Sequence, residues 1–274
     1  LGYLSFGFPV TKWWKAAFGL RPMTAINYRT SSSREFIGIE NDTVSVNNVF
    51  EGKGGVNRFF IGSAFKIYKG FSAGFNFNYL FGGIKRIKRL EFNQAGYFNT
   101  KNEVNTQIGS VYMDFGLQYA LRIKESKLVI GVTGTPTWNL SATEGQSAIT
   151  YTLLTNGGDN PRDSVLSETS ANGSLRLPLL LGAGVTYVAK DKWLVGIQFN
   201  QESWTQYQGF DGVADTNLTD SWRLSAGIEF RPGNTQRGFW NYFKKINYRV
   251  GGFYSYSPLV SKGTQVPEYG ITVG

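Results

Sequence analysis

The chain contains no cysteine and no histidine among its 274 residues. The lack of cysteine excludes disulfide bonds and thiolate nucleophiles, and the lack of histidine excludes His-ligated zinc and every Ser-His or Cys-His catalytic arrangement. No spacing of carboxylates, or of Ser and Lys, favours another catalytic arrangement. We therefore expect a protein that is not an enzyme and that holds no metal ion and no cofactor.

Long apolar runs are also missing. No stretch of about 18 or more apolar residues is present, which excludes a transmembrane helix. A transmembrane β-barrel is not excluded, because its strands need only about 10 residues of alternating character. The mean hydropathy of −0.22 therefore does not distinguish a transmembrane barrel from a soluble protein. The alternation of side chains along the chain has to distinguish them.

A recognisable beginning is missing as well. Residues 1–9 lack the basic start and the small-residue cleavage site of a signal peptide, and both ends of the chain lie within strand-like patterns. We expect a single domain over residues 1–274 that lacks its native N- and C-terminal segments.

The composition is rich in glycine and aromatic residues, with 34 Gly, 21 Phe, 15 Tyr and 7 Trp. Such a balance is typical of strands joined by tight turns. The formal net charge of +9 comes from basic residues that are scattered along the chain at about one per predicted strand. Because a nucleic-acid binder usually has a dense basic face, we do not expect nucleic-acid binding.

The segment 71–81 shows the clearest alternation in the chain. One face carries only Phe, Tyr and Ala, whereas the other carries Ser, Gly, Asn and one Leu. Since strand side chains alternate with period two, this pattern predicts a strand with one apolar face. Eleven segments are predicted to be strands: 4–10, 14–28, 59–68, 71–81, 111–122, 127–140, 175–188, 192–200, 222–231, 246–256 and 268–274.

The connections between these segments alternate in length. Short turns at one rim and long loops at the other are typical of outer-membrane barrels, whose short turns are periplasmic. The connection 232–245 breaks the rule, and we predict a short interfacial helix there. The short turns are 69–70, 124–126 and 190–191, and the long connections are 29–56, 86–106, 142–174 and 207–220.

These observations predict an all-β fold, a transmembrane antiparallel up-and-down β-barrel with 11 visible strands. The alternative is a soluble β-sandwich or lipocalin-like barrel whose apolar faces point inward. A soluble barrel of this size would need something to fill it, which favours the membrane barrel. Following the strand direction along the chain, we expect at least one further strand before Leu1.

Three stretches carry a resemblance to a known family. They are SFGFPVTKWWKAAFGLRPMTAINY, EGKGGVNRFFIGSAFKIYKGFSAGFNFNYLFGGI and YRVGGFYSYSPLVSKGTQVPEYGITVG. Together they resemble FadL-type outer-membrane transporters, in the form found in Bacteroidetes-like bacteria. The resemblance implies a barrel of 14 strands in the full protein and passive uptake of hydrophobic molecules such as long-chain fatty acids.

Two groups of charged residues are candidate sites. The first group could contact lipopolysaccharide phosphates or another anionic lipid, although a solvated loop base is the favoured interpretation. It consists of Lys85, Arg86, Lys88 and Arg89. The second group is predicted to face the lumen, where a bracing network of ion pairs is favoured over a site for a fatty-acid carboxylate. It consists of Arg21, Lys66, Asp114, Arg122, Arg176, Glu202, Arg223, Glu229 and Arg249.

Further local predictions concern two prolines and the pairing of two strands. Pro136 and Pro178 fall within predicted strands although proline cannot donate to the ladder, so each marks either a kink or opening or a position near a rim. If the strands that flank 232–245 are antiparallel neighbours, Glu229 faces Arg249 and Gly227 faces Gly251.

The sequence supports two functional hypotheses for a protein of the outer membrane of a Gram-negative bacterium. The first is passive uptake of a hydrophobic small molecule. The second is a noncatalytic barrel that serves as a subunit or scaffold of an outer-membrane secretion or surface assembly. The partners expected are outer-membrane lipid, lipopolysaccharide, a hydrophobic ligand in the first case and membrane proteins in the second.

Overall fold

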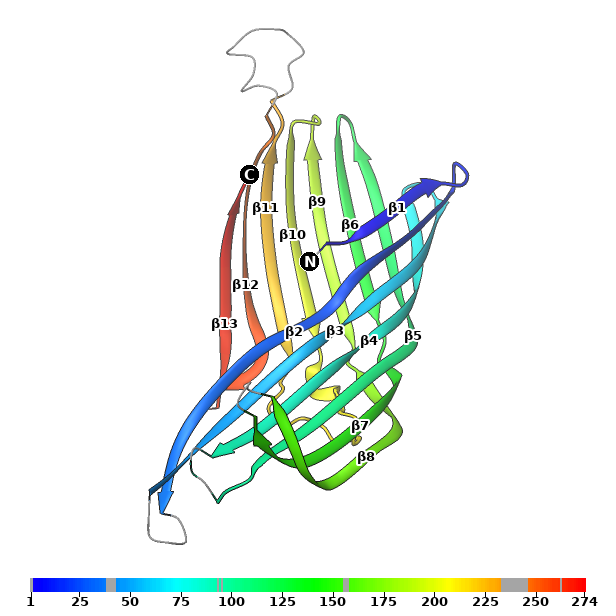
Figure 1. The fold of residues 1–274 in the computed structure, drawn as a ribbon. Coiled ribbons are helices and arrows are strands. Elements are labelled where there is room, and N and C mark those ends of the chain that lie inside the picture. Colours follow the sequence, from blue (N-terminus) through cyan, green and yellow to red (C-terminus); the bar gives the residue numbers. More distant parts are fainter. Residues whose placement is uncertain are drawn as a thin grey trace.

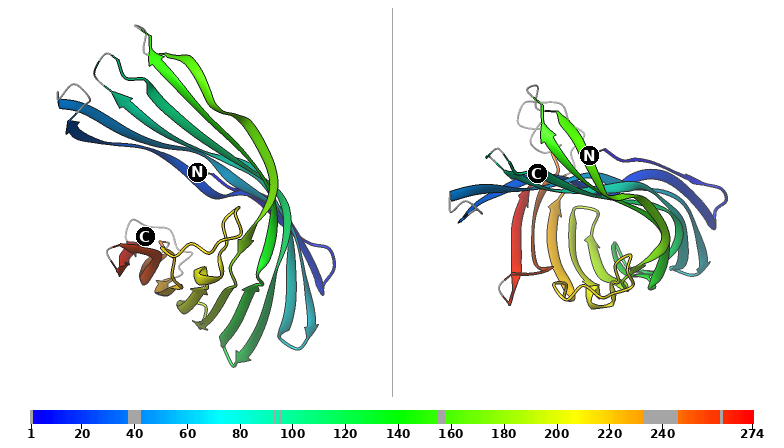
Figure 2. Two further views of the ribbon diagram at one scale, coloured as in Figure 1. Left: turned by 90° about the horizontal axis from the view of Figure 1, so that it is seen from below. Right: turned by 60° about the horizontal axis from the view of Figure 1, so that its bottom comes forward.

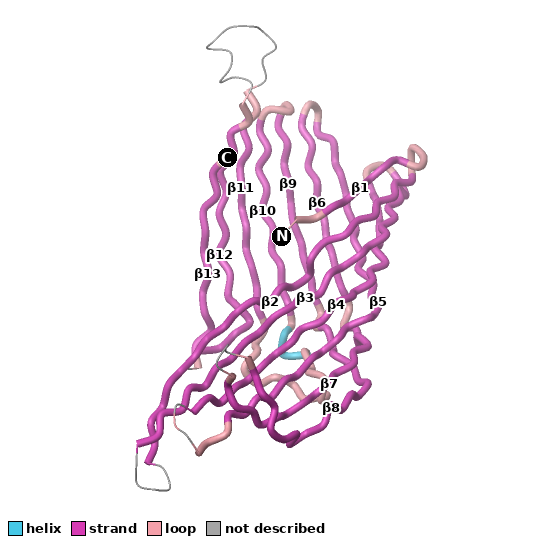
Figure 3. The backbone as a smooth tube through the Cα atoms, viewed as in Figure 1, coloured by secondary structure: helices cyan, strands magenta, loops and turns pink. Residues whose placement is uncertain are grey.

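The computed structural model describes residues 2–37, 43–92, 94, 96–154, 158–232, 246–261 and 263–274. Nearly all of them lie in antiparallel strands (Figures 1 and 3). None of the described helices is long and apolar enough to cross a membrane. The strands are β1 (Leu4–Pro9), β2 (Trp14–Ile37), β3 (Thr43–Tyr68), β4 (Phe71–Phe92), β5 (Asn99–Ile123), β6 (Ser126–Thr135), β7 (Trp138–Leu153), β8 (Asp159–Leu177), β9 (Leu180–Ala189), β10 (Trp193–Glu202), β11 (Ser221–Phe230), β12 (Tyr248–Ser261) and β13 (Thr264–Val273).

All 13 strands belong to one sheet with an up-and-down order. The main path runs β1-β2-β3-β4-β5-β6-β9-β10-β11-β12-β13, and the hairpin β7–β8 branches from β5. The sheet curves into a barrel-like wall (Figure 2), and its path does not close between β1 and β13 within the described ranges. The predicted all-β, antiparallel, up-and-down fold is confirmed.

The tight turns lie at one end of the sheet, which we call the short-turn rim and which is uppermost in Figure 1. Gly70 has a φ of 85°, Lys124 of 53° and Lys190 of 49°. Positive φ is what two- and three-residue hairpin loops require. The predicted placement of the three short turns at a common rim is confirmed.

The strands at the opposite end, the long-strand rim, extend far beyond their predicted limits. The segments 29–56 and 86–106, predicted as polar loops, are mostly the continuations of β2, β3, β4 and β5. The segment 142–174 is mostly the hairpin β7–β8. These loop predictions were wrong because the continued strands carry polar residues on both faces, so that no apolar alternation marks them.

The two prolines divide two of the predicted strands, which raises the observed number from 11 to 13. The segment 127–140 breaks at Pro136 between β6 and β7, and 175–188 breaks at Pro178 between β8 and β9. Proline supplies no N–H for a ladder, and both breaks occur where β5 changes neighbour. Strand β5 pairs with β7 up to Ile108 and with β6 from Phe115 onward.

The outward face of the strands is apolar and exposed, as a barrel presents to lipid. The residues predicted for it have exposed fractions between 38% and 52%. They are Phe75, Phe77, Phe115, Leu117, Ile197, Leu224 and Ile228. Inside, a small core of Val56, Leu80, Tyr112, Leu140 and Leu177 fills the region where β5 changes neighbour.

The helix predicted within 232–245 falls, apart from Pro232, outside the described residues.

Candidate functional site

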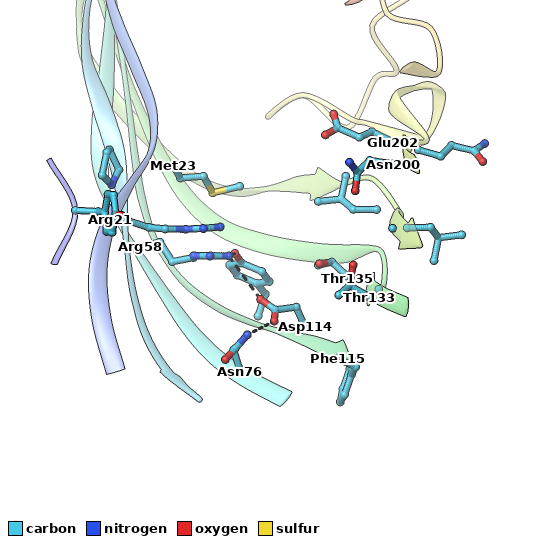
Figure 4. Close-up of a pocket in the computed structure, with 18 of the residues that line it drawn as sticks. Arg21, Met23, Arg58, Asn76, Asp114, Phe115, Thr133, Thr135, Asn200 and Glu202 are labelled. Atoms are coloured by element: carbon cyan, nitrogen blue, oxygen red, sulfur yellow. Dashed lines mark hydrogen bonds and ion pairs between the residues drawn. The ribbon is translucent and has the colours of Figure 1, made fainter. Parts of the chain in front are cut away.

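The inner wall of the sheet encloses a cavity of about 670 Å³ (Figure 4). Its lining comes from the chain's beginning, from β2 to β6 and from β9 and β10. Three of the nine predicted lumen residues line it, namely Arg21, Asp114 and Glu202. These three predicted lumen residues therefore line one cavity although their strands are far apart in the sequence.

Arg58 and Asp114 form the ionic centre of this wall, with side chains 13% and 20% exposed. The Arg58 Nη1 group donates to the Tyr112 hydroxyl at 2.6 Å and lies 3.5 Å from Asp114 Oδ2. The same carboxylate accepts hydrogen bonds from Asn76 Nδ2 and, at 3.0 Å, from Asn78 Nδ2. Because a charge in such a wall needs partners, this network satisfies Asp114 internally.

Arg21 and Glu202 are the other charged residues that line this cavity. Arg21 lines the cavity beside Arg58 and forms no ion pair with any described residue. Glu202 accepts hydrogen bonds from Trp204 Nε1 at 2.6 Å and from Ser221 Oγ at 3.4 Å. The lining therefore carries two guanidinium groups and two carboxylates, and both carboxylates accept hydrogen bonds from neighbouring side chains.

The sequence did not indicate Arg58 and its neighbours. The predicted strand 59–68 began one residue too late to include Arg58, which shares the inward parity of Lys66. Asn76 and Asn78 were assigned to the inward face of β4 without a role. Extending the alternation by one residue would have found Arg58.

The other predicted lumen residues lie outside this cavity. Lys66 and Arg122 lie near the short-turn rim, at the ends of β3 and β5. The guanidinium carbon of Arg223 lies 3.7 Å from the ring centroid of Phe253, a cation–π contact. Arg176, near the end of β8, donates its backbone N–H to Gln208 O at 3.1 Å.

Glu229 and Arg249 form a separate cluster near the short-turn rim. Their strands pair in the predicted register, with Glu229 opposite Arg249 and Gly227 opposite Gly251. Glu229 Oε2 lies 3.2 Å from Arg249 Nε, and Arg231 Nε donates to Glu229 Oε1 at 2.7 Å. The predicted pair is confirmed, and Arg231 joins it.

The four basic residues of β4 do not form one surface, because neighbouring residues of a strand face opposite sides. Lys85 pairs with Glu103 at 2.5 Å and Arg89 with Asp159 at 2.7 Å. The Lys88 ammonium lies 5.8 Å from the Phe50 ring centroid, and Arg86 lines an inner cavity instead. The four residues therefore do not form a single cluster that could face one anionic lipid.

Lys85 and Arg89 belong to an ion-pair network at the long-strand rim that the sequence did not indicate. Glu51, whose side chain is 7% exposed, lies within 4.0 Å of Arg29, Lys53 and Arg89. Asp159 lies 3.3 Å from Lys101, which also pairs with Glu103 at 3.6 Å. Four strands and the hairpin β7–β8 are linked in this way.

The connection after β10 covers the inner face near the long-strand rim. It begins with one helical turn (Trp204–Gln206) and encloses a cavity of about 600 Å³ against β4, β5, β7 and β8. The Asp220 carboxylate stabilises this turn, because it accepts a hydrogen bond from the Thr205 backbone N–H at 3.0 Å. Burial raises the pKa of Tyr207, which lines this cavity.

A known protein family matches the chain over its whole length. A family model described as BamG matches residues 1–274. A comparison with curated proteins gives no match. BamG is a different family from the FadL-type transporters, so the resemblance drawn from the three sequence stretches was wrong, and the fatty-acid uptake that it implied loses its basis.

Proposed function

The chain belongs to the BamG family, and from this premise we propose that it is a noncatalytic barrel subunit of an outer-membrane assembly. In this proposal the protein lies in the bacterial outer membrane, with lipid against its exposed apolar face. It acts by holding other proteins of the assembly, and its charged residues brace its own wall.

The observation that carries the proposal is a difference in strand length. Strands β2 to β5 have 24, 26, 22 and 25 residues, whereas β9, β10 and β11 have 10 each. At roughly 3.3 Å per residue the longest strand measures about 85 Å and the short strands about 33 Å. An outward apolar band is only about 25 Å tall, and strands tilt by roughly 45° at most.

The short strands therefore match a membrane, while the long strands exceed it about twofold. The excess and the hairpin β7–β8 together form what we call the projecting sheet, residues 24–37, 43–56, 82–92, 99–109, 138–154 and 158–177. It extends past the ends of β12 and β13 in Figure 1. Because long loops and extensions of outer-membrane barrels lie on the extracellular side, we place the projecting sheet outside the cell. A large structured surface there suits a subunit that contacts proteins.

The inner wall supports a structural lumen. Asp114 and Glu202 accept hydrogen bonds from neighbouring side chains, and the connection after β10 covers part of the inner face near the long-strand rim. A channel for polar solutes would need an open, solvated path, which a subunit does not require.

Depletion of the protein in its own host tests the proposal. We expect the amounts of other outer-membrane or surface-exposed proteins to fall, measured by quantitative mass spectrometry of the outer membrane, while uptake of radiolabelled fatty acid stays unchanged. Mild-detergent purification of the tagged full chain should recover it in a complex. An unchanged outer-membrane protein profile together with recovery of an isolated barrel would contradict the proposal.

A further inference from the structure

Strand β8 has an open edge in the middle of the chain. On one side it pairs with β7 over most of its 19 residues. On the other side, within the described ranges, it makes a single bridge, between Arg176 and Gln208. Figure 2 shows β8 on the rim of the projecting sheet, apart from β9, which follows it in the chain.

Two hydrogen bonds establish which backbone groups this edge presents. The Arg176 N–H donates to Gln208 O at 3.1 Å, so it points away from β7. Ser141, the β7 partner of Ser174, donates its N–H to Ser110 Oγ on β5 at 3.1 Å, so it points away from β8. Since backbone groups alternate direction along a strand, Ser170, Asn172 and Ser174 present their N–H and C=O groups to the open side.

This part of the edge has none of the features that usually prevent strands from adding. Proteins blunt exposed edges with proline, charged side chains and bulges. The beginning of β8 has all three, in Pro161, Arg162 and Asp163 and in register shifts against β7. Between Thr169 and Leu175 the sequence TSANGSL has no charge and no proline, and its pairing with β7 is regular.

The chain itself shows what kind of group fits this edge. Gln208 approaches it as an extended backbone and occupies only the position next to Arg176. On the inner face the Phe210 ring covers Gly173, where an added Cβ would come within 2.7 Å of it. Farther along, Ser170, Ala171 and Asn172 are exposed and small, so a neighbouring backbone can approach without steric hindrance.

The geometry points to strand addition: an extended segment of a partner polypeptide pairs with β8 along Ser170, Asn172 and Ser174. Only a polypeptide offers donors and acceptors at the repeat of about 6.6 Å that two strand residues span, so a lipid or a sugar does not fit. Main-chain hydrogen bonds give such complexes affinity with little demand on side chains. This inference rests on the proposed role as a subunit of a protein assembly.

Photo-crosslinking in living cells tests the geometry. The full chain carries p-benzoylphenylalanine at position 170, 172 or 174, or, as a control, at Val165 in the blunted part of the same strand, which is 69% exposed. We expect crosslinks to one partner segment from the first three sites and not from position 165. As the site moves by two residues, the crosslinked partner residue should move by two, as paired strands require.

A matched pair of substitutions tests the backbone separately from the side chain. Asn172→Pro removes an outward N–H without removing a bond to β7, whereas Asn172→Ala keeps it, and both remove the hydrogen bond with Thr143. We expect the proline variant to recover about tenfold less partner in pull-downs than the alanine variant. Heat-modifiable migration on gels verifies that both barrels are folded, and Ser174→Pro replaces Asn172→Pro if the latter does not fold.

The outcomes separate this inference from the function on which it rests. If the parent chain recovers no partner at all, the proposed subunit role fails. If a partner is recovered equally by the proline and alanine variants, or if crosslinks from positions 170 and 172 reach partner residues that are not two apart, strand addition is overturned and the subunit role stands.

Discussion

The region of long strands, β2 to β5, and the region of short strands, β9 to β11, follow the same alternation but end at different heights. In the short region each strand stops after 10 residues, at a turn or a polar connection. In the long region the outward face of β4 changes from aromatic residues such as Phe77 and Tyr79 to the charged Lys85 within one strand. We therefore expect the two parts of this one sheet to meet different environments, lipid and water.

The two regions also differ in what holds them. Outward side chains of the short region are apolar, and lipid would supply their contacts. The projecting sheet instead joins its strands through ion pairs centred on Glu51 and Asp159. We therefore expect the change of outward side chains from apolar to polar, rather than strand length alone, to mark the membrane boundary.

The largest effect is expected from a charge placed on the apolar part of the outward face. Leu224→Arg in the short region and Phe77→Arg in the part of β4 nearest the short-turn rim should each destabilise the folded barrel by about 2 to 4 kcal/mol. Gln107→Arg, on the same face but in the projecting sheet, should change the stability by less than about 0.5 kcal/mol. Urea titrations in lipid vesicles measure the free energy of unfolding of all three variants. Equal losses of stability would contradict a boundary between the two regions.

A slightly smaller effect is expected from the inner wall. Arg58→Met removes the donor to Tyr112 and the cation beside Asp114, which should cost about 1.5 to 3 kcal/mol. Adding Asp114→Asn should cost less than the sum of the two single changes, because the two groups share one network. Additive costs in the same titration would show that the pair is not coupled.

A local effect is expected in the projecting sheet. Glu51→Gln weakens contacts to three cations and should lower local stability by roughly 1 kcal/mol. Hydrogen exchange should therefore quicken in 43–56 and 82–92 and stay unchanged in β9 to β11. Faster exchange throughout the sheet would mean that the projecting sheet is not an independent unit.

The smallest effect is expected from the cluster near the short-turn rim. The two guanidinium groups that hold Glu229 are exposed, with side chains 43% and 61% accessible, and such pairs contribute little. Glu229→Gln should leave the urea midpoint within experimental error of the parent. A clear shift would show that this cluster braces the wall as Arg58 does.

The sequence allowed the short region to be predicted well and the projecting sheet poorly, for one physical reason. Apolar alternation marks strands such as 192–200 and 222–231, because one face is apolar and the other carries mainly polar or small residues. In stretches such as 29–37 or 159–174 both faces are polar, and Ser, Asn and Gly are typical of loops when no alternation opposes them. The register of Glu229 and Arg249 could be predicted because their two strands follow each other in the chain. The contact of Arg58 with Tyr112, between residues 54 positions apart, depends on the whole sheet.

Single-cysteine labelling in intact cells tests whether the long strands leave the membrane while their parts nearest the short-turn rim remain in it together with the short strands. The parent chain has no cysteine, so each substituted position reports alone. With a membrane-impermeant maleimide, we expect Asn102→Cys and Gln107→Cys in the projecting sheet to react, and Phe77→Cys on the lipid face and Lys190→Cys in the short turn to stay unlabelled. Labelling at position 190 with none at 102 would reverse the orientation, and equal protection at 102 and 77 would contradict the projecting sheet itself.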